Sequence, residues 1–221
     1  YKGGYRSWWG FETLPEVNEE TPSFVEFITG EGGVIDTWLR RGAAGFRLDV
    51  ADELPDEFIE KIRIAVKRVS PEKFLLGEVW EDATTKFGFD HRRTYLLGKG
   101  LDSVMNYPFK NSVLDFVKGK PAQQAANEIL SICEHYPAPA INTALNFLST
   151  HDTERALTVI ADEPANGRGR EWQSGRSVTG EAYEEGMLRL RMAYAIIYTL
   201  PGVPCLYYGD EIGMQGYRDP F

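Results

Sequence analysis

Short apolar segments alternate with amphipathic helical stretches along this chain, and this alternation limits its possible folds more than any other feature. Helical spacing of apolar residues is clearest at Phe58, Ile62 and Val69, ahead of Pro71. Apolar strands separated by helices are typical of a parallel sheet covered by helices. The sequence therefore predicts an α/β fold whose buried strands span residues 45–50, 74–80, 103–109, 144–150 and 204–209.

The spacing and number of these strands favour part of a barrel. Asp49 and Glu78 are 29 positions apart and Glu78 and Asn106 are 28 apart, which suits one strand–helix unit each. A complete eight-stranded barrel needs about 250 residues, more than the 221 present. An open doubly wound sheet is the alternative, but no glycine-rich phosphate turn follows any strand. The GEGG run at 30–33 is predicted as a helix break before Val34.

Composition narrows the function classes. The chain has 24 basic and 33 acidic residues, and its net charge of −9 argues against nucleic acid and anionic membranes as partners. The longest nearly apolar run, residues 192–200, is far shorter than the roughly 20 residues of a membrane span. No signal peptide is visible, and the start at Tyr1 suggests a processed or truncated product.

The two cysteines, Cys133 and Cys205, are predicted to be buried free thiols, with a single disulfide as the alternative. Such sparse cysteine use favours a cytoplasmic over a secreted location only slightly. It leaves the compartment undecided.

Carboxylates occur at the ends of the predicted strands. Asp49, Glu78, Asp152 and Asp210 each lie at or just beyond such an end. Burying an ionised carboxylate is costly unless it is paired or used, and barrel enzymes build their chemistry at this end of the strands. Arg47 lies two positions before Asp49, so the two side chains share a face and suit a charge pair. A structural ion pair is the alternative, but repetition on several strands favours a functional site.

Other chemistries are less well supported. His151 stands next to Asp152, but no GxSxG or reactive-cysteine context accompanies the pair. The three histidines are scattered without metal-ligand spacing, so we predict no catalytic metal and no cofactor, while a structural calcium ion stays open. Glu78 is next to Val79 and Trp80, and large apolar neighbours raise the pKa of a carboxyl group, which suits a proton donor. The alternative is a solvated glutamate at the strand end, with Trp80 in the core.

Aromatic residues in loops point to sugars, whose CH faces stack on rings while acids bind their hydroxyls. Each ring taken alone favours a core or loop anchor over a sugar-stacking platform. The best candidate is the Trp8-Trp9-Gly10-Phe11 run, because such a run in a glycine-flanked loop makes a poor helix or strand core. The candidate rings are Trp8, Trp9, Phe11, Trp80, Tyr107 and Trp172.

Three segments resemble signature segments of the α-amylase superfamily, glycoside hydrolase family 13: GFRLDVADE at 45–53, GEVW at 77–80 and FLSTHDTER at 147–155. PGVPCLYYGDEIGM at 201–214 is similar to the family's last barrel strand, and LPEVN at 14–18 to its fifth signature. The resemblance covers essentially the whole chain. It implies a parallel (β/α)8 TIM-type barrel that is incomplete here, with about the last five strand–helix units in residues 1–221. Residues 1–24 would be an aromatic, glycine-rich loop region after strand three, and 161–180 a long loop after strand seven.

The resemblance also implies roles at the site. Asp49 would be the nucleophile with Arg47 as its partner, Glu78 the general acid/base, and Asp152 the third acid. His151, Trp80, Glu53 and Trp9 would bind substrate. The family retains anomeric configuration, so the carboxyl groups of Asp49 and Glu78 are expected about 5–5.5 Å apart.

The expected substrate class follows from the same likeness. WWGF, LPEVN and Asp52-Glu53 resemble most the neopullulanase, cyclomaltodextrinase and maltogenic amylase group. The expected substrates are therefore maltodextrins, cyclodextrins or pullulan, cleaved at α-1,4 bonds, with α-1,6 bonds as a second expectation, by hydrolysis or transglycosylation.

Some family features are absent from the sequence. The first signature, an Asp followed by Asn-His, is missing together with the first three strands. We therefore expect the chain itself to be weakly active or inactive, and to self-associate over an open barrel edge. A non-catalytic carbohydrate-binding or assembly protein from the same barrel is the alternative, against which the intact acids argue.

Overall fold

The computed structural model describes residues 4–218, so the ends of the predicted 1–221 unit, residues 1–3 and 219–221, lie outside the described residues. Its main strands are parallel and follow one another in chain order. β1 (Gly45–Leu48), β2 (Phe74–Gly77) and β5 (Ser103–Val104) form one sheet, and β6 (Leu145–Asn146) pairs with β7 (Val203–Pro204). A parallel bridge between Met105 and Leu145 joins the two sheets. The predicted α/β fold with parallel strands is confirmed.

Helices fill the connections between these strands. They are α1 (Pro22–Thr29), α2 (Val34–Arg40), α3 (Asp56–Val69), α4 (Tyr107–Val117), α5 (Ala122–His135), α6 (Ala138–Ile141), α7 (Ala156–Ala161), α8 (Arg170–Ser174) and α9 (Gly180–Ile197). Short 3-10 turns are η1 (Trp8–Gly10), η2 (Ala51–Glu53) and η3 (Asp210–Ile212). The GEGG run separates α1 from α2 as predicted, with Gly30 ending one helix and Gly33 preceding the next.

The strands are shorter than predicted, and the largest error lies in residues 103–109. There the strand ends at Val104 and α4 begins at Tyr107. The Asn106 side chain accepts a hydrogen bond from the Phe109 N–H at 3.2 Å, and Pro108 sits in the first helical turn. An Asn cap followed by proline is a strong helix start, which the apolar character of the segment obscured.

Two other elements differ from the sequence prediction. The hairpin of β3 (Phe87–Gly88) and β4 (His91–Arg92) was not predicted. The expected loop regions are also partly helical, because α1 begins at Pro22 and α8 lies within 161–180.

Helix α3 shows how the sequence dictates packing. Its buried residues Phe58, Ile59, Ile62, Ala65 and Val66 repeat at helical spacing and face the core. Acidic residues occupy its first turn and basic ones its last, which complements the helix dipole.

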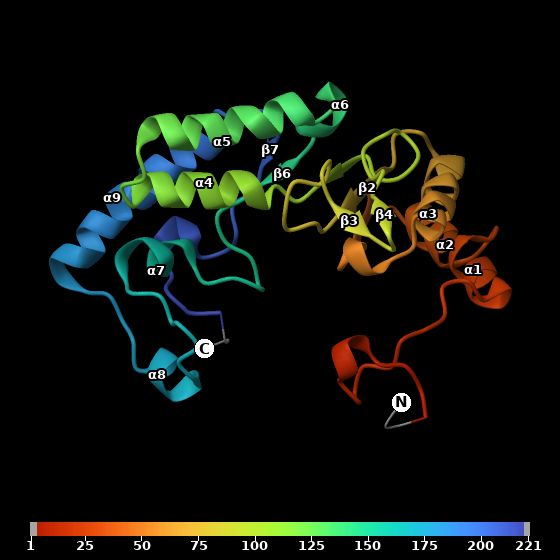
Figure 1. The fold of residues 1–221 in the computed structure, drawn as a ribbon, viewed down its shortest axis with the longest axis horizontal. Helices are drawn as coiled ribbons and strands as arrows, with labels where there is room; N and C mark the ends of the chain where they lie inside the picture. The colour runs from red at the N-terminus through yellow and green to blue at the C-terminus, as the bar shows by residue number, and fades with distance from the viewer. Residues whose placement is uncertain (1–3, 219–221) are drawn as a thin grey trace.

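A main apolar core packs the helices on the strands, and a smaller cluster lies nearer the strand ends. Met105, Tyr107 and Phe147 make this second cluster. The segments at the two ends of the chain lie on one side of the molecule, away from α4 and α5 (Figure 1).

Cys133 and Cys205 are free thiols, half-buried rather than fully buried. Among residues 4–218, no helix combines the length and apolar character that crossing a bilayer requires.

Candidate active site

The register of β1 on β2 brings the first two predicted acids together. Leu48 pairs with Gly77, so Asp49 and Glu78 follow side by side at the same end of the sheet. Gly77 leaves room for the Leu101 side chain against β2, since a Cβ there would lie 2.2 Å from a methyl carbon of Leu101. Val50, with φ of +43°, turns the chain away directly after Asp49 and ends the strand.

Arg47 joins the two carboxylates. Its Nη1 donates to Asp49 Oδ1, and its Nη2 lies 3.1 Å from Glu78 Oε2. The Nη2 contact is an ion pair without hydrogen-bond geometry, so this buried N–H group has no hydrogen-bond partner among the described residues. Asp49 itself is 72% exposed and free to meet a ligand. The predicted Arg47–Asp49 pair is therefore present, and the same guanidinium also reaches Glu78.

Glu78 is buried and surrounded by hydrogen-bond donors. Its Oε2 accepts from the Val50 N–H at 2.8 Å, and its Oε1 from the Trp80 indole at 3.0 Å. The Tyr107 hydroxyl lies 3.4 Å from the same Oε1. With 4% of its side chain exposed, Glu78 is not the solvated strand-end glutamate considered as the alternative.

Asp152 is part of the same neighbourhood through Tyr107. Burial raises the pKa of the Tyr107 hydroxyl above its ordinary value, and the negative charges of Glu78 and Asp152 raise it further. His151 Nε2 lies 3.1 Å from Asp152 Oδ2, and both side chains are open to solvent. The structure thus brings His151 to Asp152, and the charges of Asp152 and Glu78 both act on the Tyr107 hydroxyl.

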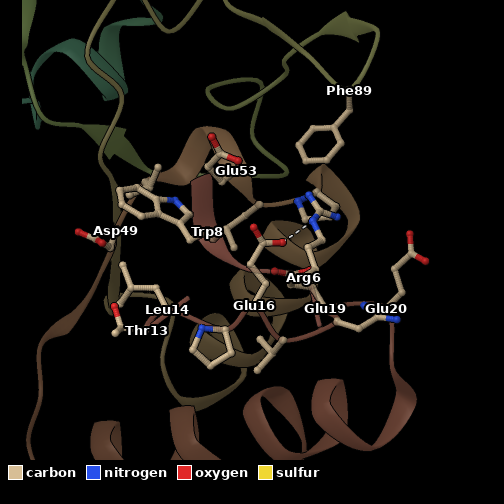
Figure 2. Close-up of a pocket in the computed structure, with 16 residues that line it drawn as sticks. Arg6, Trp8, Thr13, Leu14, Glu16, Glu19, Glu20, Asp49, Glu53 and Phe89 are labelled. Atoms are coloured by element: carbon tan, nitrogen blue, oxygen red, sulfur yellow. Dashed lines mark hydrogen bonds and ion pairs between the residues drawn. The ribbon is translucent and has the colours of Figure 1, made fainter. Parts of the chain in front are cut away.

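A cavity of about 810 Å³ opens beside Asp49 (Figure 2). The N-terminal segment forms one wall, including Trp8 and the Leu14–Asn18 motif, and Asp49 and Glu53 lie on the other. An ion pair of 2.5 Å between Arg6 and Glu16 ties the N-terminal segment together within the cavity wall. The cavity is therefore bordered by a predicted catalytic acid and a predicted substrate-binding residue.

The aromatic run forms a stack next to this cavity. The rings of Trp8 and Trp9 are parallel at 4.7 Å, and Phe11 stacks on Trp8 at 6.2 Å. Trp9 is 71% exposed, and its indole N–H donates to Glu53 Oε1 at 3.1 Å. Trp8, rather than the predicted Trp9, lines the cavity, while Trp9 links the aromatic loop to Glu53.

Trp80 presents a ring close to Glu78. It stacks on Tyr107 at 4.5 Å and stays 39% exposed. The Arg218 guanidinium lies 5.9 Å from the Trp80 ring centre. A ring so placed can contact a sugar bound at Glu78.

Asp210, the fourth strand-end acid, has a structural role. It is buried, its Oδ1 lies 3.3 Å from Arg155, and the Tyr194 hydroxyl donates to its Oδ2 at 2.5 Å. Asp210 thus lies in a buried ion pair with Arg155, whereas the structural alternative in the sequence analysis concerned Arg47 and Asp49. Within residues 4–218, no group of three or more His, Cys, Asp or Glu side chains could hold a metal ion.

Several contacts of the site were missed from the sequence. The Val50 N–H and the Tyr107 hydroxyl both bind Glu78, and the Met105 sulfur accepts from Arg47 Nε at 3.4 Å. The Asn106-x-Pro108 cap signal could have placed Tyr107 at a helix start. The other two depend on strand register, which single-sequence patterns do not supply.

Comparison with known proteins gives the family. Residues 4–220 match the alpha-amylase catalytic domain. The chain is 33% identical to an amylopullulanase of Thermoanaerobacter thermohydrosulfuricus, over 99% of this chain and 15% of that protein. It is also 33% identical to a cyclomaltodextrinase of a Bacillus species, over 95% of this chain and 32% of that protein.

A solved structure agrees with these matches. The cyclic alpha-maltosyl-(1→6)-maltose hydrolase from Arthrobacter globiformis, in complex with maltose, superposes with a TM-score of 0.78 and 29% identity over 98% of this chain. The match covers 42% of that structure, so the chain spans less than half the length of these relatives. Together, the strand-end acids, the sequence matches and the shared fold show that this chain belongs to the alpha-amylase catalytic-domain family.

Proposed function

We propose that this chain supplies the reactive groups of a retaining α-glucan hydrolase or transglycosylase. The substrates are maltodextrins, cyclodextrins or pullulan, with α-1,4 bonds as the first target and α-1,6 bonds as the second. The names of the relatives support this substrate class, since they include cyclomaltodextrinases and a neopullulanase. The shared Arg47 contact with Asp49 and Glu78 is the observation that carries the proposal.

The proposed reaction has two displacements. Asp49 attacks the anomeric carbon while Glu78 protonates the departing glycosidic oxygen, which leaves a glucosyl ester on Asp49. Glu78, now ionised, takes a proton from water or from a sugar hydroxyl, and that oxygen displaces Asp49. Two inversions retain the α configuration, and every step uses side chains of this chain and the incoming acceptor.

The remaining site residues hold the sugar. Asp152 and His151 bind its hydroxyl groups, and the Asp152 charge stabilises the oxocarbenium-like transition state. Trp80 stacks on a sugar next to the cleaved bond, and Trp8 with Glu53 borders the Asp49 side. Arg47 orients the Asp49 carboxylate, because its Nη1 donates to Oδ1.

We also propose that the strand row is part of a barrel. β1 and β7 each pair on one side only among the described residues, and an unpaired strand edge tends to bind another strand. Further strands of a longer polypeptide, or a second copy of this chain, would cover these edges.

Hydrolysis of α-maltosyl fluoride tests the proposed chemistry even if turnover is weak, because fluoride leaves without a proton donor. We expect the protein to release fluoride with first-formed product in the α configuration, and Asp49→Asn to lower the rate at least about 10³-fold. Asp115→Asn, at a 52% exposed carboxylate paired with Lys120, is the control and should act like wild type. Maltooligosaccharide binding without any Asp49-dependent turnover would instead support the non-catalytic carbohydrate-binding alternative.

A further inference from the structure

The hairpin that follows Glu78 reaches back to the turn that follows Asp49. β3 and β4 belong to the segment 81–95, and the turn at 51–54 consists of η2 and Leu54. Arg93, the residue directly after β4, joins the two, and its side chain is 0% exposed. The reaction proposed above assigns no part to Arg93.

Each nitrogen of the Arg93 guanidinium donates to a different acceptor at or near this turn. Nη1 donates to the Asp52 carbonyl at 3.0 Å, and Nη2 donates to the Leu54 carbonyl at 2.6 Å. Nε donates to Asp56 Oδ1 at 2.8 Å, and the guanidinium lies 4.5 Å from the ring centre of Tyr95. A planar guanidinium holds three such acceptors in fixed directions, which the single ammonium group of a lysine cannot do.

Two more side chains of the segment 81–95 bind the Asp52 carboxylate. The buried Tyr95 hydroxyl donates to Oδ1 at 2.7 Å, and Lys86 Nζ lies 2.8 Å from Oδ2. Burial raises the pKa of Tyr95 above its ordinary value, and the Asp52 carboxylate raises it further, so the hydroxyl stays a donor at neutral pH. The turn is thus held by its backbone through Arg93 and by its Asp52 side chain through Tyr95 and Lys86.

The turn depends on such contacts because the residue before it is strained. Val50 has φ of +43° and ψ of 55°, in the left-handed region. This conformation is unfavourable for a β-branched side chain, which crowds its own backbone there. A strained residue persists only where the surrounding contacts fix it, and the turn at 51–54 supplies contacts directly after Val50.

Val50 and the residue after it contact the proposed acid. The Val50 N–H donates to Glu78 Oε2 at 2.8 Å, and the Ala51 N–H donates to the Glu78 carbonyl at 3.1 Å. Glu53, the last residue of η2, lines the Asp49 cavity (Figure 2). A displacement of the turn would therefore remove a donor from Glu78 and change the cavity wall at the same time.

We propose that Arg93 is a positioning residue for the reaction: it holds the turn at 51–54 so that the Val50 N–H stays on the Glu78 carboxylate. This inference rests on the proposed function, in which Glu78 is the acid. The acceptors of Arg93 lie at or near the turn, so Arg93 acts on Glu78 through the turn and not by direct contact.

Arg93→Lys tests the proposal, because lysine keeps the positive charge but cannot hold three acceptors. Its matched control is Arg92→Lys. Arg92 is exposed, and its Nε donates to the Thr84 carbonyl at 2.6 Å, within the hairpin segment rather than on the turn. Tyr95→Phe is a second, milder variant that removes the hydrogen bond to Asp52 and keeps the ring beside Arg93.

The first measurement is hydrogen exchange of single amides, followed by NMR on the full chain. The Val50 amide reports on the turn, and the Phe74 amide, which is hydrogen-bonded at the other end of the β1–β2 pair, reports on the sheet. We expect Arg93→Lys to lower the protection of Val50 about tenfold or more and that of Phe74 less than about twofold. Tyr95→Phe should lower Val50 protection about threefold, and Arg92→Lys should change neither amide.

The second measurement separates positioning of the acid from a general loss of activity. Cleavage of maltotriose needs a proton from Glu78, whereas fluoride release from α-maltosyl fluoride does not. We expect Arg93→Lys to lower kcat on maltotriose about tenfold or more and fluoride release less than about threefold. Arg92→Lys should leave both rates unchanged.

Unchanged Val50 protection in both Arg93→Lys and Tyr95→Phe would overturn the proposal. An equal loss of protection at Val50 and Phe74 would also overturn it, because Arg93 would then stabilise the whole fold, and so would a loss at Val50 without any loss of kcat on maltotriose. A wild-type chain that protects Val50 but turns over neither substrate would contradict the proposed function and leave Arg93 a structural residue of the turn.

Discussion

Glu78 must give a proton to the leaving oxygen and later take one from the acceptor, and its surroundings suit that exchange. Its contacts come from a backbone N–H, an indole, a hydroxyl and one nitrogen of Arg47. Together these contacts fix the carboxyl group in position at the end of β2.

Glu78→Gln separates the acid role from the nucleophile role. We expect the variant to lose about 10²–10⁴-fold in kcat on maltotriose, because the amide cannot protonate the leaving oxygen. With α-maltosyl fluoride, which needs no such proton, formation of the maltosyl ester on Asp49 should stay near the wild-type rate. Stopped-flow fluoride release measures that first step.

Glu81→Gln is the matched control, because Glu81 is 63% exposed and pairs with Lys86. It should leave both substrates unaffected. If Glu78→Gln lowered kcat on maltotriose and the rate of fluoride release from α-maltosyl fluoride by the same factor, the acid role of Glu78 would be contradicted. A structural role would then be favoured.

The strand-end positions of Asp49 and Glu78 were predictable from apolar runs with an acid after each, whereas β6 ends at Asn146, well before Asp152. The catalytic roles of the three acids stay predictions. The Arg47 contact with Glu78 depends on the pairing of Leu48 with Gly77, and no local pattern encodes that register. Trp9 was predicted to bind substrate, but Trp8 lines the cavity. The backbone at Trp9 has φ of +50°, a turn that the spacing of apolar residues does not predict.

Asp102 links helix α3 to the sheet through hydrogen bonds and ion pairs. Its carboxylate accepts from Arg63 and Lys67 of α3 at 2.7 Å each, and from the Leu75 N–H of β2 at 2.8 Å. Burial acts to raise the pKa of Asp102, but these hydrogen bonds outweigh it and hold the pKa below its ordinary value. The ionised form is therefore the one that stabilises the fold.

Asp102→Asn should lower the free energy of unfolding by about 2–3 kcal/mol, because two cations lose their counter-charge at a largely buried position. Urea denaturation at pH 7 measures the change. Asp115→Asn, at an exposed pair, should cost less than about 1 kcal/mol. If the two variants were equally stable, the Asp102 network would not hold the elements together.

The hairpin β3–β4 is linked to α3 by a pH-sensitive pair. His91 Nε2 lies 2.8 Å from Asp56, and this hydrogen bond, with one to the Phe89 carbonyl, raises the pKa of His91. A raised histidine pKa stabilises the folded state below its unfolded value of about 6.5, and this stabilisation is lost as pH rises through the folded pKa. The Tm difference between wild type and His91→Gln should therefore be largest near pH 6 and shrink toward pH 9. A difference that is constant over this range would contradict the pair's contribution.

Elements were predicted well where one periodic signal dominates. The helical spacing from Phe58 to Val69 is observed as α3, and its physical cause is a single apolar face. The prediction of a strand over 103–109 was wrong because apolar content alone does not distinguish a strand from a capped buried helix. The hairpin at 87–92 was not predicted because its strands are two residues each, too short for an alternation of apolar and polar residues to show.

For the whole molecule, the open strand edges predict association. Exposed apolar side chains gather at and after β7, including Val203 at 48%, Tyr208 at 66% and Ile212 at 70% exposure. We expect the isolated 221-residue chain to form dimers or larger species at micromolar concentration in analytical ultracentrifugation. A monomer with well-protected amides along β1 in hydrogen exchange would contradict this.

The central claim is that Asp49 forms a bond to glucose while Glu78 and Asp152 act on the same ring. Glu78→Gln treated with 5-fluoro-α-D-glucopyranosyl fluoride should accumulate the fluoroglucosyl ester on Asp49. Fluoride leaves without a proton from Glu78, so the ester still forms, while its hydrolysis needs Glu78 as the base. Peptide mass spectrometry should find one fluoroglucosyl group, on Asp49, and none in the Asp49→Asn, Glu78→Gln double variant. A label on any other residue, or one that persists in the double variant, would contradict the account.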